Sequence, residues 1–224
     1  MKSKSIYIIF TIVLLVTFSI DSSDKKKLTI ISNTYFPVNN GKTLVYESSF
    51  GESSTKYFHD GEFTISLSEG EDFKYKQTLI IKEDGVYVKE MYQYLKIFLF
   101  IKKEATVTYN KPLLRFPLPL LPGMKWEWEG EEYSDGEANK VKVSGKVLGN
   151  EIITTKAGKL EAIKMETIIE SGDDAKNIVT EWYTEDLGLI KAKIIIDGGG
   201  VMGLLRDVLG YGTLEFELAE IRTE

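Results

Sequence analysis

Two tryptophans alternate with acidic residues in the stretch W-E-W-E-G-E-E, which covers residues 126–132. Carboxylates beside aromatic rings are found at sugar sites, where a pair of carboxyl groups acts as acid and as base or nucleophile. The same alternation is typical of a half-buried strand, with Trp126 and Trp128 on one face and Glu127 and Glu129 on the other. Because catalysis needs a fixed spacing between two carboxylates, we favour the strand and expect a protein that is not an enzyme.

Other catalytic chemistry has few residues to use. His59 is the only histidine, which excludes histidine-rich metal sites, and cysteine is absent, which excludes disulfides, zinc thiolates and a cysteine nucleophile. The pattern G-x-S-x-G of a serine hydrolase is also absent. The acidic turns at residues 134–137 and 171–174 do not match the spacing of a calcium loop. We therefore expect no catalytic residue, no metal and no cofactor.

The elements that position these residues are predicted to be β-strands. Asp-Gly pairs separate alternating apolar and polar runs at residues 60–61, 84–85, 135–136 and 197–198. Asp-Gly suits the tight hairpin turn in which both central residues need a positive φ. Residues 151–193 form the expected centre, with two alternating runs on either side of a polar turn at residues 171–174. This recurrence predicts an antiparallel, up-and-down sheet.

Three segments are unusually apolar. Residues 94–101 are predicted to form a strand that is covered on both faces, or one whose outer face meets a ligand or partner. Residues 113–122 contain three prolines, so we expect a stiff apolar loop and not a central strand, either as a plug of the core or as the rim of a pocket. Residues 201–209 have apolar side chains at helical spacing, which predicts a short amphipathic helix, either a permanent cap or a lid.

The N-terminus is predicted to be a leader. Lys2 and Lys4 precede an apolar run from Ile6 to Phe18, and small residues allow cleavage after Ser19. We expect a signal peptide over 1–23, a linker over 24–33 and one antiparallel β-domain over 34–224. The protein is then exported and is periplasmic or extracellular, or it is retained by an uncleaved N-terminal anchor. The formal net charge is −6 without a basic patch, so no nucleic-acid partner is expected.

Several stretches resemble one group of bacterial envelope proteins. They are A-G-x-L-x-A-x-K from Ala157, E-W-Y followed by L-G-L-I-K over 181–191, Y-F-P over 35–37 with Gly41 and Tyr46 after it, and F-P-L through P-G-M-K-W over 116–126. In this arrangement the chain resembles uncharacterised proteins described as TapB-like or as a domain of unknown function. The resemblance implies an incomplete antiparallel β-barrel similar to that of the lipoprotein carriers LolA and LolB, and location in the envelope.

The sequence thus predicts a mainly β fold: a single antiparallel incomplete barrel or strongly curved sheet, with a short helix near the C-terminus. The expected function is non-enzymatic binding of a lipid or other apolar small molecule in the concave face. The alternative is a structural or assembly component of the envelope, with an envelope protein as partner and a filled core. The predicted ligand contacts are Phe98, Phe100, Phe116, Leu118, Leu120, Leu121, Leu204 and Leu205.

Overall fold

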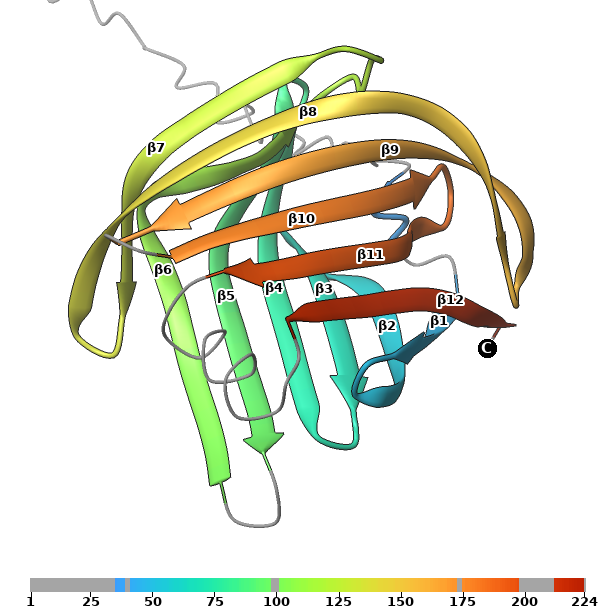
Figure 1. The fold of residues 1–224 in the computed structure, drawn as a ribbon, viewed down its shortest axis with the longest axis horizontal. Helices are drawn as coiled ribbons and strands as arrows, with labels where there is room; N and C mark the ends of the chain where they lie inside the picture. The colour runs from blue at the N-terminus through green and yellow to red at the C-terminus, as the bar shows by residue number, and fades with distance from the viewer. Residues whose placement is uncertain (1–34, 39–40, 98–100, 173–174, 198–211, 224) are drawn as a thin grey trace, which may run out of the picture.

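The computed structural model describes residues 35–38, 41–97, 101–172, 175–197 and 212–223, and these residues form an all-β barrel (Figure 1). Its strands, in chain order, are β1 Lys42–Ser48, β2 Gly51–Asp60, β3 Phe63–Gly70, β4 Phe73–Lys82, β5 Gly85–Ile97, β6 Ile101–Pro117, β7 Lys125–Ser134, β8 Glu137–Thr155, β9 Gly158–Ser171, β10 Ala175–Thr184, β11 Gly188–Asp197 and β12 Thr213–Thr223. Each strand pairs antiparallel with its neighbours in sequence, as the recurrent hairpin turns predicted.

The barrel is closed, which corrects the expectation of an incomplete barrel or an open curved sheet. The first and last strands pair with each other, from Lys42 opposite Thr223 to Ser48 opposite Phe216. This pairing joins the two ends of the domain, and a closed sheet leaves no exposed edge. Local alternation could not reveal it, because alternation sets which face a side chain takes and does not select a distant partner strand.

The described residues contain no helix, whereas the sequence predicted a short helix beside the sheet. The segment for which that helix was predicted, residues 201–209, lies outside the described residues. No described helix is therefore long and apolar enough to cross a membrane.

The strands form two crossing layers. Strands β9 to β12, orange to red in Figure 1, run across strands β4 to β6, drawn in green. The long strands β8 and β9 arch over one side of the molecule and curve from one layer toward the other. Strands β6 and β7 form a short ladder at a corner, with Thr108 opposite Tyr133 and Tyr109 opposite Glu132.

Tight turns lie beside three of the Asp-Gly pairs, and only at 135–136 do both residues of the pair occupy the turn as predicted. Turns follow Asp60 and precede Gly85, and Asp135 and Gly136 connect β7 to β8. The φ angles of Asp135 and Gly136 are 53° and 82°, which is the backbone geometry expected of a type I′ hairpin. The fourth predicted turn, at 197–198, falls at the end of β11, and its glycine lies outside the described residues.

Two apolar segments differ from their predictions. Residues 94–101 contain the end of β5 and the start of β6, so they contribute to two strands and not to one. Residues 113–117 belong to β6, where Leu113 pairs with Val88 and Phe116 with Val86, so the expectation of a loop over all of 113–122 was wrong. The reason is that Pro117 is the last residue of the strand, where its missing N–H interrupts no further pairing.

The main core lies inside the barrel. Phe36, from the segment before β1, is 2% exposed and stacks on Phe116 with ring centroids 5.9 Å apart. Tyr57 and Tyr183 pack against Phe36 with their rings tilted or edge-on. Tyrosine and phenylalanine rings in such contacts bury large areas and contribute beyond the area alone. The N-terminal segment therefore supplies part of the core that the strands enclose.

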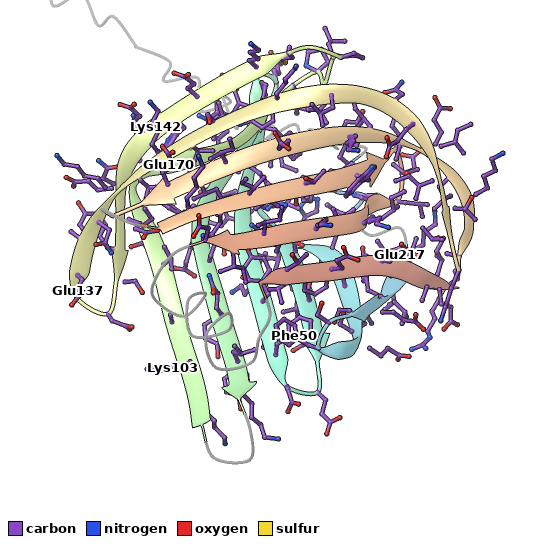
Figure 2. All side chains as sticks on the ribbon, viewed as in Figure 1. Phe50, Lys103, Glu137, Lys142, Glu170 and Glu217 are labelled. Atoms are coloured by element: carbon purple, nitrogen blue, oxygen red, sulfur yellow. The ribbon has the colours of Figure 1, made fainter. Side chains whose placement is uncertain are left out.

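A smaller apolar cluster joins the two layers elsewhere in the barrel. It consists of Phe73 on β4, Leu95 on β5, Ile196 on β11 and Leu214 on β12. Phe50, labelled in Figure 2, packs against this cluster together with Phe216. Figure 2 also shows charged side chains on the outer surface, among them Lys142 and Glu170, which are opposite each other on β8 and β9.

Candidate functional site in the barrel interior

Strand register identifies the side chains that point into the barrel. Directly paired residues share a face, and residues two apart on a strand share it too. On β4 the face that carries Leu79 of the core also carries Gln77 and Tyr75. On β10 the inward face carries Tyr183, Glu181 and Val179. The interior thus combines apolar residues with polar and charged ones.

A β-bulge turns Arg115 into this interior. Val86 is opposite Phe116 while Tyr87 is opposite Leu114, so Arg115 is the extra residue on β6. Without a bulge, Arg115 and Phe116 would point to opposite faces. Here Phe116 is fully buried in the core and the Arg115 guanidinium contacts Glu181 across the barrel.

Arg115 and Glu181 form an ion pair between the two layers. Arg115 Nη2 donates to Glu181 Oε1 at 2.6 Å and to the Tyr183 hydroxyl at 2.6 Å. Arg115 Nη1 donates to Gln77 Oε1 at 2.6 Å, and the Tyr183 hydroxyl donates to Glu181 Oε1 at 3.1 Å. The side chains of Arg115 and Glu181 are 16% and 10% exposed, so the pair is largely shielded from solvent.

Electrostatics keep Arg115 charged. Burial alone would lower the pKa of Arg115. The Glu181 charge and the nearby tyrosine oxygens raise it by a larger amount, so the guanidinium pKa lies above its usual value. Burial also raises the pKa of the Tyr183 and Tyr75 hydroxyls, which stay protonated. The network therefore holds one positive and one negative charge, which offset each other.

A second group of polar side chains continues from Gln77. Gln77 Nε2 donates to the Tyr75 hydroxyl at 2.9 Å, and that hydroxyl donates to the Met91 sulfur at 3.1 Å. The Tyr109 hydroxyl lies 3.7 Å from the same sulfur. A thioether is a weak acceptor, so the hydroxyl donors of Tyr75 and Tyr109 are held by a weak partner.

The ion pair separates the closed main core from a less tightly filled part of the interior, which we call the accessible part and which lies between the ion pair and the cluster of Phe73 and Leu95. On one side of Gln77 along β4 lies Leu79, which is 0% exposed, and on the other lies Tyr75, which is half-buried. On one side of Glu181 along β10 lies Tyr183, which is 1% exposed, and on the other lies Val179, which is half-buried. The accessible part also has further inward-facing, half-buried side chains: Gln93, Ala105 and Asn177.

The residues predicted as ligand contacts are distributed over several places. Phe116 and Leu120 are buried in the main core, at 0% and 6% exposure, and Leu118 packs against that core. Leu121 is 53% exposed. The remaining four, Phe98, Phe100, Leu204 and Leu205, lie outside the described residues. Ligand contact by this set stays a prediction.

The residues around the ion pair were missed by sequence reasoning. Arg115 stands alone among apolar neighbours in L-L-R-F-P, and Glu181 follows an apolar run and precedes Trp182. A single charge within an apolar stretch is a signal for a buried pair, because an unpaired charge is rarely buried. The partner of each charge was not readable, since 66 residues separate them in the chain.

Strand β7 has the alternation that the sequence predicted. Trp126 and Trp128 are buried, at 6% and 7% exposure, whereas Glu127 and Glu129 are exposed on the outer face. The tryptophans and these carboxylates thus occupy opposite faces and form no shared site. His59 is half-buried within β2, opposite Thr64. Among the described residues, no group of three or more histidine and acidic side chains is placed to hold a metal.

Comparison with known proteins gives only distant matches. No family model matches the chain, and no curated protein matches it. The chain is similar to a solved structure from Parabacteroides distasonis that is provisionally described as a lipoprotein, with 12% identity, a TM-score of 0.43 and coverage of 84% of this chain and 98% of that one. It is also similar to a structure from Bacteroides fragilis NCTC 9343, provisionally described as an exported protein with a YmcC-like fold, with 12% identity, a TM-score of 0.44 and coverage of 85% and 99%.

These matches are too distant to assign a family or an activity. The resemblance to TapB-like proteins and to the carriers LolA and LolB stays a prediction. Functional inference therefore has to start from the barrel interior.

Proposed function

We propose that this protein is a non-enzymatic protein of the cell envelope whose barrel binds a lipid or another amphiphilic small molecule. The observation that carries the proposal is the accessible part of the interior. Side chains such as Tyr75, Gln93 and Val179 point inward by register and yet are only partly buried. Ligand sites of β-barrels are concave, largely apolar and supplied with a few polar groups that orient the ligand.

The accessible part offers both surfaces that an amphiphile needs. Val179 and its inward-facing partner Ile194 supply apolar surface on one layer, and Val107 lies inward on β6. Tyr75 and Gln93, opposite each other on β4 and β5, supply polar groups. An acyl chain packed against the first set would release water from apolar surface, while the second set would hydrogen-bond its head.

The proposed location rests on the sequence before the barrel. Lys2 and Lys4 precede the apolar run Ile6–Phe18, which is the pattern of an export signal. Cleavage after Ser19 would release the protein into the periplasm or the extracellular space, and an uncleaved leader would hold it at the membrane. An envelope location suits a carrier of amphiphiles, whose ligands are abundant there.

A structural or assembly role is the second candidate. Its support is the packing of Phe116 and Leu120, which the sequence offered as ligand contacts and which are buried by the protein itself. In this case the same apolar residues stabilise the barrel, and the outer surface meets an envelope protein.

Native mass spectrometry of protein exported by its host and purified without detergent tests the two candidates. The binding proposal expects a bound apolar species under native conditions that is lost on denaturation. The variant Val179→Trp should fill the accessible part and abolish the adduct. Thr180→Trp, on the opposite face of the same strand, is the matched control and should retain it. A wild-type protein that never carries a ligand, and takes up none of a set of added lipids, would favour the structural role.

A further inference from the structure

We infer that the polar head of the ligand is uncharged, with hydroxyl or amide groups as in a monoacylglycerol, and is not a carboxylate or phosphate. This inference rests on the proposed function, because it concerns the same accessible part of the barrel. It follows from the juxtaposition of Arg115 and Glu181 at the inner end of that part.

Of the three nitrogens of the Arg115 guanidinium, only Nε, which is buried, has no hydrogen-bond partner among the described residues. Both terminal nitrogens are engaged at 2.6 Å, one with Gln77 and the other with Glu181 and the Tyr183 hydroxyl. The positive charge of Arg115 is offset by the carboxylate of Glu181 within hydrogen-bonding distance. An incoming carboxylate would meet no net positive charge and would have the Glu181 carboxylate as a neighbour, and like charges at close range repel strongly in a shielded interior.

In the part of the chain that the structure describes, the other charged groups on the inward face do not change this balance near the ion pair. Lys103 shares the inward parity of β6, but its side chain is exposed, and Figure 2 shows it on the part of β6 that extends away from the crossing strands. Glu132 faces inward on β7, where its carboxylate accepts a hydrogen bond from the Ser171 hydroxyl at 2.5 Å. Glu132 adds negative charge, which disfavours an anionic head still further.

The neutral groups in the accessible part are suited to hydroxyl and amide partners. The Tyr75 hydroxyl donates to the Met91 sulfur, a weak acceptor that a ligand oxygen can replace with a gain in bond strength. Among the described residues the buried Asn177 Oδ1 atom has no hydrogen-bond partner, so it can accept from a ligand hydroxyl. Each of these bonds satisfies a polar group without bringing a charge out of water.

Titration calorimetry with two probes that share one acyl chain tests the inference. Monooleoylglycerol and oleate are added below their critical micelle concentrations to the mature chain at about pH 8, where a free carboxyl group is ionised. Monooleoylglycerol should bind about ten-fold or more tightly than oleate, since one lost or repelled polar contact changes affinity by roughly that factor. If oleate binds as tightly as monooleoylglycerol or more tightly, the inference is wrong, whereas the proposed function is still supported. Binding of neither probe, nor of other lipids, would count against the proposed function itself.

A charge variant links the preference to the ion pair. Glu181→Gln leaves Arg115 without its counter-charge, so oleate should gain affinity and the preference should narrow or reverse. Glu170→Gln removes the same charge from the exposed face of β9 and should leave the preference unchanged. A folded Glu181→Gln protein with the wild-type preference would contradict the inference. If that variant fails to fold, the comparison of the two probes on the wild-type protein still decides.

Discussion

Arg115 on β6 and Glu181 on β10 are joined by a hydrogen bond of 2.6 Å, although 66 residues separate them in the chain and their strands are not neighbours in the barrel. The bond therefore connects the two crossing layers through the interior. It also marks the boundary between the filled core around Phe116 and the accessible part around Tyr75. This ion pair thus affects the stability of the barrel and also the polarity of the surface that a ligand would contact.

Glu181→Ala should destabilise the barrel by about 3 kcal/mol, because it leaves the Arg115 guanidinium buried without a counter-charge. The double variant Arg115→Met/Glu181→Leu should be considerably less destabilised than the sum of the two single changes, since it removes both desolvated charges at once. Equilibrium unfolding in urea measures each free energy of unfolding. Additive losses in the double variant would show that the two residues do not interact.

Stability should fall as the pH rises above about 10, because buried tyrosines are held protonated in the folded barrel. Burial is the largest cause that raises the pKa of Tyr57, from 10.0 to about 12, and it raises the pKa of Tyr46 and Tyr183 in the same direction. The unfolded chain therefore loses these phenol protons first as pH rises, so between the unfolded pKa and the folded pKa the unfolded state is stabilised relative to the folded state.

An alkaline titration followed by tyrosinate absorbance and circular dichroism checks this pH dependence. The buried tyrosines Tyr46, Tyr57 and Tyr183 should ionise only as the barrel unfolds. The variant Tyr57→Phe should show a weaker loss of stability between about pH 10 and pH 12. If every tyrosine ionised in one step near pH 10 while the barrel stayed folded, the prediction would be wrong.

Gly145→Ala should destabilise the barrel by about 1–3 kcal/mol through overpacking. A Cβ atom at Gly145 on β8 would lie 2.1 Å from the Trp126 ring, which packs across it from β7. Gly212→Ala is the matched control, because a Cβ atom there has no heavy atom of the described structure within 4 Å. Thermal unfolding of both variants checks the difference. Equal melting temperatures for the two would mean that Trp126 does not lie over Gly145.

Gly136→Val should destabilise the β7–β8 hairpin by about 1–2 kcal/mol, because the φ of 82° is strained for a residue with a Cβ atom. Asp135→Asn should be nearly neutral, since Asn-Gly suits the same type I′ turn. Urea unfolding measures both effects. A neutral Gly136→Val variant, or a large loss in Asp135→Asn, would argue against this turn geometry.

Several features of the candidate site and fold could be predicted because they depend on local patterns. The alternation of Trp126 and Trp128 with Glu127 and Glu129 placed two residues on each face of β7, and burial follows that alternation. The pair Asp135-Gly136 predicted a tight hairpin, and both residues have the positive φ that the turn needs. In each case the information lies within a few residues, where strand periodicity and steric limits on φ apply directly.

Other features depend on contacts between distant parts of the chain, and only the tertiary structure decided them. Alternation places Arg115 and Phe116 on opposite faces, but a bulge opposite Val86 brings both inward, and its position depends on how β5 and β6 are aligned. Closure depends on the pairing of β1 with β12, which no local pattern encodes. The sequence by itself determined strand faces and turns, because these follow from the geometry of neighbouring residues. Tertiary structure decided barrel closure, the inward turn of Arg115 and its pairing with Glu181, because these depend on long-range strand register.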